Sequence, residues 1–183
     1  MILQNEICHI EINIDETYTV DSVDNRHYDV TLNPEHYRHN DLSKTLSIHI
    51  GLYAREFQVA LIGPYHSYDL DCAVLQDDIL TVLQDNMITQ IKITDAYIIR
   101  HVVLDCLGCN FAIYKVEKGY IIYGEIEITM LDLDFKKQWS FSGKDIFVSI
   151  SNREAFTIRE NLICLYDFEN NYYEIDFNGK QII

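Results

Sequence analysis

The chain has 183 residues, of which 48% are hydrophobic and 23% are charged. This composition excludes an intrinsically disordered chain, because a chain of this length and hydrophobicity can bury a core of its own. The formal net charge is −15 at pH 7. A surface with such an excess of carboxylates repels phosphate backbones and anionic lipid, so we expect neither nucleic acid nor a membrane as a partner.

The start of the chain and the cysteines indicate the compartment. The N-terminal segment alternates apolar and polar residues and includes Glu6 and Glu11, whereas a secretory signal needs a basic start and an unbroken apolar stretch. No apolar run approaches the roughly 20 residues of a membrane helix. The five cysteines are odd in number and scattered, unlike a disulfide framework. The sequence therefore predicts a cytoplasmic protein with reduced thiols.

We expect residues 1–183 to form a single domain, with residues 1–42 as a distinct N-terminal segment and residues 79–183 as a repeat-containing β region. Within the N-terminal segment, Asn33 supplies an N-cap and Pro34 a proline at the first helical position. This pair predicts a short helix from about Pro34 to Asn40.

The chain beyond this segment is dominated by short alternating runs rich in Ile, Val, Tyr and Phe. β-branched and aromatic side chains at every second position are typical of half-buried strands. In chain order, the expected strands are Leu46–Leu52, Phe57–Ile62, Met87–Ile93, Tyr97–Leu104, Tyr120–Met130 and Tyr172–Phe177. The sequence therefore predicts a mainly β fold with at most one or two short helices.

The stretch Asp77–Met87 fits two structures. Its apolar residues follow one helix face, and they also fit a strand, a turn at Gln84-Asp85-Asn86 and a second strand. We favour the hairpin because a weak repeat includes it. Ile88 aligns with Ile128 at a spacing of 40 residues, and Asp132 aligns with Asp176 at a spacing of 44. Spacings of this size are typical of propeller blades.

The last hundred residues, approximately, resemble the blade repeat of quinoprotein-type β-propellers. The residues that carry the resemblance are Leu131-Asp132, Ile175-Asp176, Asn178-Gly179-Lys180 and Trp139. The resemblance implies blade-like antiparallel sheets, in a small propeller-like or a sandwich arrangement. The chain is too short for the ring that holds the quinone, so no cofactor is expected. Because Phe135 stands where the repeat has a glycine, we expect no tight turn after Asp134. The combined pattern also resembles bacterial proteins of the accessory or immunity type.

Two motifs could hold a metal. Cys106 and Cys109 form a CxxC, and His36 and His39 would lie on one side of a helical turn. Neither motif has a convincing further ligand in the sequence, so we predict no metal site. The alternative interpretation of each motif is structural: half-buried small side chains in a turn for the cysteines, and a solvated connection for the histidines.

Carboxylates and tyrosines are the candidate binding residues. Residues i and i+2 of a strand share a face, so Glu125 with Glu127, and Asp132 with Asp134, would project together. Tyr172 and Tyr173 add amphipathic contact residues. The sequence contains no recognisable nucleophile motif and no phosphate-binding loop.

These residues support three hypotheses about function. The first is a non-enzymatic protein that binds a basic protein partner, in an inhibitor or immunity-type role, since complementary charge speeds association and selects the partner. The second is a small-molecule or carbohydrate-acting protein that uses carboxylates and tyrosines in a cleft. The third is a module that forms homo-oligomers through free edge strands, of which Gln181-Ile182-Ile183 is the candidate.

Overall fold

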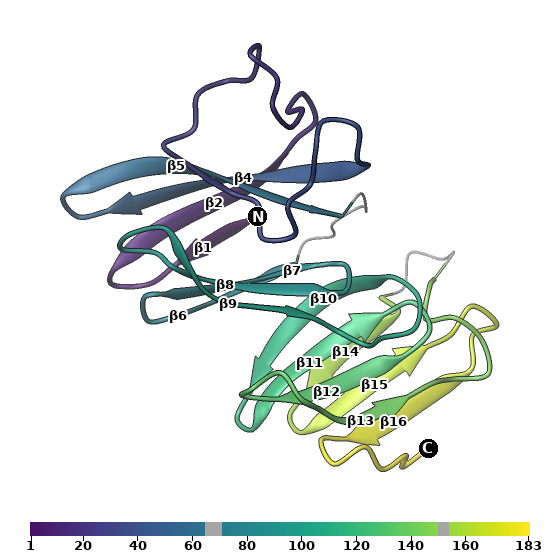
Figure 1. Cartoon of the computed structure of the whole chain (residues 1–183). Helices are drawn as coiled ribbons and strands as arrows, with labels where there is room; N and C mark the ends of the chain where they lie inside the picture. The colour runs from purple at the N-terminus through teal and green to yellow at the C-terminus, as the bar shows by residue number, and fades with distance from the viewer. Residues whose placement is uncertain (65–70, 150–153) are drawn as a thin grey trace. The chain divides into compact units, whose positions relative to one another are not determined.

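The computed structural model of the protein describes residues 1–64, 71–149 and 154–183 (Figure 1). These residues form β-strands and no helix, which confirms the predicted mainly β fold of blade-like antiparallel sheets. No helix in the described ranges could therefore cross a membrane. The contacts divide the chain into two compact units, Met1–Leu104 and Asp105–Ile183. The single-domain organisation stays a prediction, and each unit is described by itself.

The first unit contains a five-stranded sheet and a four-stranded sheet. The five-stranded sheet has the order β1-β2-β4-β5-β3, in which only β3 and β5 are parallel. Residues 1–42 contribute β1, β2 and β3 to this sheet. The four-stranded sheet is an antiparallel meander, β6-β7-β8-β9. The strands are β1 (Ile2–Gln4), β2 (Cys8–Asp15), β3 (Val30–Leu32), β4 (Ser43–Leu52), β5 (Arg55–Pro64), β6 (Ala73–Gln76), β7 (Ile79–Gln84), β8 (Met87–Lys92) and β9 (Tyr97–Val103).

The two sheets of this unit share one core. Ile10 and Ile12 of β2 and Ile48 of β4 are buried, because successive side chains of a strand point to opposite faces. They cluster with Leu80 and Val82 of β7, from the four-stranded sheet. The apolar residues that alternate along each strand in the sequence therefore form its buried face.

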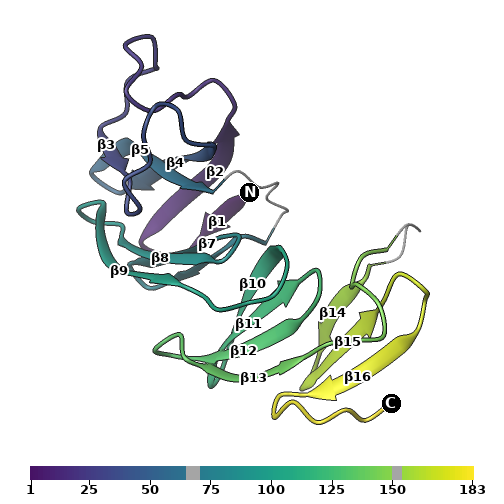
Figure 2. The same cartoon turned by 45° about the vertical axis from the view of Figure 1, so that its right-hand side comes forward.

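The second unit contains a four-stranded and a three-stranded sheet (Figure 2). Both are antiparallel and follow the chain order, β10-β11-β12-β13 and β14-β15-β16. Their shared core includes Phe147, which comes from the connection after β13 and is fully buried. The strands are β10 (Asn110–Val116), β11 (Gly119–Gly124), β12 (Ile128–Asp132), β13 (Lys137–Phe141), β14 (Phe156–Arg159), β15 (Leu162–Tyr166) and β16 (Tyr172–Asp176).

The last residues run along the edge of the three-stranded sheet. Gln181 forms a bridge with Ile175, and the Ile182 N–H donates to the Glu174 carbonyl oxygen at 2.7 Å. Ile182 and Ile183 are exposed. The candidate edge segment therefore lies beside β16, and oligomerisation through it stays a prediction.

The predicted hairpin and repeat are confirmed. β7 and β8 pair across a turn at Asp85-Asn86, in which Asp85 has a φ of 54°. β8 and β12 are each the third strand of a four-stranded sheet. Each also has a register shift at the equivalent place, after Gln90 in β8 and after Met130 in β12. The spacing of 40 residues therefore relates two four-stranded sheets that share the position of the strand and its register shift.

The turns after β12 and β16 have the same hydrogen bonds. The Asp132 carboxylate accepts the Lys136 N–H at 2.9 Å, and the Asp176 carboxylate accepts the Lys180 N–H at 2.9 Å. Phe135, with a φ of 61°, takes the left-handed conformation of Gly179, whose φ is 81°. The expectation of no tight turn after Asp134 is therefore wrong. Burial of the Phe135 ring against the Tyr120 ring, 5.1 Å away, offsets the backbone strain.

The predicted helix from Pro34 to Asn40 is also wrong, because the Asn33 side chain closes a turn there. Its Oδ1 accepts the Tyr37 N–H at 2.9 Å, and its Nδ2 donates to the Tyr37 carbonyl at 2.8 Å. His36 has a φ of 58°, which a helix does not allow. The asparagine thus acts on the backbone as a turn residue rather than as a helix cap.

Candidate functional site

A cavity of about 310 Å³ opens beside β5 in the first unit. We call it the acidic cavity, because three of the residues that line it are carboxylates and one is a cation. The lining residues are Asp29, Val30, Arg55, Glu56, Phe57, Asp95 and Ala96.

Three separate segments of the first unit build this cavity. Arg55, Glu56 and Phe57 begin β5, where the chain leaves the β4–β5 hairpin. Asp29 precedes β3, and it is tied to β5 by two hydrogen bonds: its N–H donates to the Gln58 carbonyl at 3.0 Å, and its Oδ2 accepts the Gln58 N–H at 2.8 Å. The β8–β9 turn supplies Asp95.

One guanidinium already lies in the acidic cavity. The Arg55 guanidinium is 5.3 Å from the centroid of the Phe57 ring and 3.5 Å from the Asp95 carboxylate. A cation over an aromatic face and beside a carboxylate is a favourable arrangement. The ring and the carboxylate thus form a place suited to a guanidinium or an ammonium group.

The other two carboxylates leave the lining with an excess negative charge. Asp29 lies 4.0 Å from His27 and Glu56 lies 3.5 Å from His49, and a histidine adds positive charge only when protonated. With neutral histidines, the residues that line the cavity carry three negative charges against one positive charge. The acidic cavity can therefore accept a further cationic group.

The loop that leads to Asp29 is ordered by internal contacts. The Tyr28 hydroxyl donates to Asp15 at 2.7 Å, and Arg26 lies 3.3 Å from the same carboxylate. Burial works to raise the pKa of Asp15, but hydrogen bonds from Tyr28 and Thr17 and the charge of Arg26 outweigh it, so this pKa is lowered. The Arg26 guanidinium is thereby engaged in an ion pair with Asp15.

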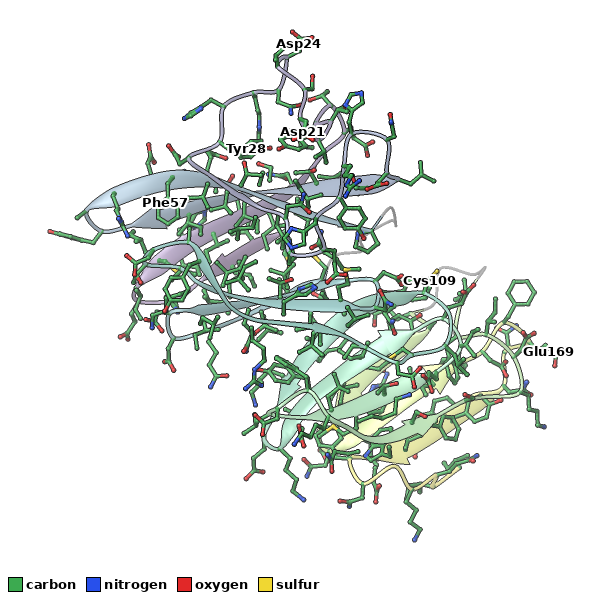
Figure 3. All side chains as sticks on the ribbon, in the orientation of Figure 1. Asp21, Asp24, Tyr28, Phe57, Cys109 and Glu169 are labelled. Atoms are coloured by element: carbon green, nitrogen blue, oxygen red, sulfur yellow. The ribbon has the colours of Figure 1, made fainter. Side chains whose placement is uncertain are left out.

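The outer part of the same loop is acidic and exposed. Asp21 and Asp24 lie there, with Asp24 at the outer end, while Tyr28 lies where the loop returns toward the sheet (Figure 3). Val23, between the two aspartates, is 96% exposed. This loop therefore presents an apolar side chain flanked by carboxylates.

The structure places Glu125 and Glu127 outside the strands and in different environments. The expected strand Tyr120–Met130 is interrupted after Gly124, whose N–H donates to the Glu127 carbonyl, so both glutamates lie in the bend between β11 and β12. Glu125 is half-buried, whereas Glu127 is buried and accepts from the Lys137 ammonium at 3.1 Å. The prediction that the two carboxylates project together from one strand face is therefore wrong.

Asp132 and Asp134 belong to the turn after β12. Asp132 is half-buried, and its carboxylate accepts the N–H groups of Asp134 and Lys136 and the side-chain amide of Gln138. Asp134 is exposed. The Asp132 carboxylate thus stabilises the turn, and a role of either residue in partner binding stays a prediction.

Tyr172 and Tyr173 are neighbours on β16 and point to opposite faces. Tyr173 is buried in the core, where its hydroxyl donates to Asp167 at 2.7 Å. Tyr172 is half-buried on the other face, where its hydroxyl donates to Glu174 at 2.5 Å. The structure therefore places only Tyr172 where a ligand could reach it.

The metal motifs are not assembled. Cys106 and Cys109 are half-buried in the connection between β9 and β10, and burial raises the pKa of the Cys106 thiol. His39 hydrogen-bonds the Val20 carbonyl through its Nδ1. Within residues 1–64, 71–149 and 154–183, no three His, Cys, Asp or Glu side chains are grouped as a metal ion would require.

Sequence reasoning missed the residues of the acidic cavity, because they come from three segments with no shared motif. The one local signal is the alternation of Arg55 and Phe57 around Glu56, which places a cation and a ring on the same face of a strand.

Comparisons with known proteins find a likeness in structure but none in sequence. No family model matches the chain, and no curated protein matches it. The structure is similar to the crystal structure of Hsv2 from Kluyvelomyces marxianus, with a TM-score of 0.43 and 8% sequence identity. The match covers 85% of this chain and 49% of that chain, so the chain spans about half the length of the Hsv2 structure.

Proposed function

We propose that this protein binds a basic protein partner, in a non-enzymatic inhibitor or immunity-type role. The observation that carries the proposal is the acidic cavity, whose lining includes a phenyl ring and three carboxylates but a single guanidinium. A Lys or Arg side chain of the partner would enter beside Arg55 and pair with Asp29 and Glu56.

The charge of the first unit supports this proposal. Residues 1–104 contain 6 Lys and Arg against 16 Asp and Glu, which gives −10 of the total of −15. A field of one sign steers an oppositely charged protein toward the surface and raises the association rate. Val23 on the acidic loop would add apolar contact, and an ordered loop loses little entropy on binding.

The proposal includes a cytoplasmic location, supported by five cysteines that are all in the thiol form. A closer relationship of the C-terminal half to quinoprotein-type propellers is part of the same proposal, and it brings no cofactor with it.

The test is a pull-down with matched charge variants, from a lysate of the cells that make the protein. The variant Glu56→Gln/Asp95→Asn removes two charges from the acidic cavity. The control Glu117→Gln/Glu169→Gln removes two exposed charges from the second unit. We expect the wild type and the control to retain the same basic protein at near-equal stoichiometry, with retention that weakens as salt rises.

The affinity of the identified protein is then measured for each variant. We expect the cavity variant to bind about tenfold more weakly, with most of the salt dependence lost, and the control to bind as the wild type does. If only the control loses binding, the partner uses the second unit and the acidic cavity is not the site. If the wild type retains no basic protein at low salt, the proposed function is wrong.

A further inference from the structure

A second cavity, of about 280 Å³, lies on the three-stranded sheet of the second unit. We call it the tyrosine cavity. Its lining residues are Glu154, Thr157, Arg159, Cys164, Tyr166 and Tyr172. The residues next to these along the strands, among them Phe156, Ile163 and Tyr173, belong to the core. Because side chains alternate along a strand, the tyrosine cavity occupies the face turned away from that core.

Two aromatic rings form one wall of the tyrosine cavity. Tyr166 and Tyr172 are directly opposite in the register of β15 and β16, and their ring centroids are 4.8 Å apart. The hydrogen bond of Tyr172 with Glu174, its contact with Cys164 and its burial all raise the pKa of Tyr172. The Tyr172 hydroxyl therefore stays protonated at neutral pH, and its ring remains neutral.

The polar side chains beside these rings offer both kinds of hydrogen-bonding group. A guanidinium donates only, a carboxylate accepts only, and a hydroxyl does both. Arg159 supplies the guanidinium, Glu154 the carboxylate and Thr157 the hydroxyl. Arg159 and Glu154 are exposed, and neither forms an ion pair with another described residue.

The charges of this lining balance, unlike those of the acidic cavity. Arg159 offers one positive charge and Glu154 one negative charge, so the lining does not select an ion by its net charge. A neutral ligand that carries both donors and acceptors fits this set best. The volume is near the lower end of ligand cavities, which run from roughly 300 Å³ upward, and it suits a ligand of one ring.

We propose that the tyrosine cavity binds one ring of a neutral saccharide. The C–H face of the sugar would pack on Tyr166 and Tyr172, since tyrosine offers an apolar ring face together with a polar hydroxyl. Vicinal sugar hydroxyls, each a donor and an acceptor, would pair with Arg159 and Glu154. The inference goes beyond the proposed function, and it involves residues of the second unit only.

The experiment is saturation-transfer difference NMR on the full chain. The probes are glucose, galactose, mannose, N-acetylglucosamine, maltose and cellobiose, each at millimolar concentration, with alanine as a zwitterionic probe. We expect at least one saccharide to receive saturation from the wild type and alanine to receive none. Arg159→Ala should weaken saccharide binding by about tenfold to a hundredfold, the effect of one charged hydrogen bond. Tyr172→Ala should abolish it.

The control variant is Tyr53→Ala, which removes a fully exposed tyrosine from the first unit. It should bind saccharide as the wild type does. Because Arg159 is exposed, Arg159→Ala tests the site even if Tyr172→Ala fails to fold. Three results would overturn the proposal: no saturation of any saccharide, saturation that Arg159→Ala leaves unchanged, or saturation of alanine alone.

Discussion

Asp167 is a buried charged residue of the second unit, with an exposed fraction of 1%. Its carboxylate accepts hydrogen bonds from the Tyr173 hydroxyl at 2.7 Å and from the Asn171 N–H at 2.8 Å. The Tyr173 hydroxyl in turn accepts a hydrogen bond from the Lys144 N–H at 3.0 Å. Burial works to raise the pKa of Asp167, but the hydrogen bonds from Asn171 and Tyr173 outweigh it, so this pKa lies below its usual range. The folded state thus prefers the ionised form.

The direction of this shift predicts how stability depends on pH. A carboxyl with a lowered folded pKa contributes stability that is present above its unfolded pKa, about 3.9, and is lost as pH falls through the folded pKa. We therefore expect Asp167→Asn to lower the free energy of unfolding by roughly 1–3 kcal/mol at pH 7, and to cost progressively less below about pH 4.

Urea unfolding of both proteins across this pH range measures the difference. Asp24→Asn, at an exposed loop aspartate, is the control and should match the wild type throughout. A loss of stability in Asp167→Asn that is the same at every pH would show that packing, and not the carboxylate charge, is responsible.

At the scale of the element, one kind of turn recurs in the second unit. An aspartate at the end of a strand accepts the N–H four residues later through its carboxylate, and the residue before that N–H is left-handed. The three aspartates are Asp132, Asp167 and Asp176, and the left-handed residues are Phe135, Asn170 and Gly179. Asparagine and glycine adopt this conformation easily, whereas phenylalanine needs compensation from burial.

Gly179 is the member of this set that a substitution should disturb most visibly. A Cβ there would lie 2.7 Å from the Trp139 ring, whose Nε1 donates to the Phe177 carbonyl at 3.2 Å. We expect Gly179→Ala to lower the free energy of unfolding by roughly 1–2 kcal/mol, from the positive φ and the displaced ring. Trp139 is the only tryptophan, so its fluorescence should shift as well.

Gly51→Ala is the matched control, because a Cβ at Gly51 would meet its nearest atom at 3.6 Å, an ordinary contact. Tryptophan fluorescence and thermal unfolding of Gly179→Ala and Gly51→Ala test this prediction. Unchanged emission and stability in Gly179→Ala would mean that the turn adapts without moving Trp139.

The strands and turns show how much of the fold could be predicted from the sequence. The strands and the 77–87 hairpin follow from side-chain alternation, which is a local property. The aspartates of the repeat aligned at 44 residues and proved to make the same hydrogen bonds. The break at Gly124 was missed, because the apolar residues on either side continue the alternation and only the carbonyl of Glu127 closes the bend.

The candidate site could be predicted less well than the fold. Alternation tells which residues share a strand face, but it does not tell which face is buried, and so Tyr173 and Glu127 were expected at a surface. The residues of the acidic cavity are far apart in sequence. Asp29 comes to the cavity through the pairing of β3 with β5, and Asp95 through the packing of the two sheets around one core.

At the scale of the whole molecule, the described residues form two core clusters. Ile48 is fully buried in the first core and Phe147 in the second, and each cluster draws its residues from one unit only. A buried side chain stabilises the elements packed around it, so local opening of one unit should depend mainly on its own core.

Truncation of each core residue tests this directly. Phe147→Ala should cost about 3–5 kcal/mol and Ile48→Ala about 2–5 kcal/mol. In hydrogen exchange, we expect Phe147→Ala to speed exchange in β11, β12, β15 and β16 while β2 and β4 keep their protection. Ile48→Ala should give the reverse pattern, and each variant therefore serves as the control for the other. If either variant speeds exchange equally in all of these strands, the two units unfold together and behave as the single domain that the sequence predicts.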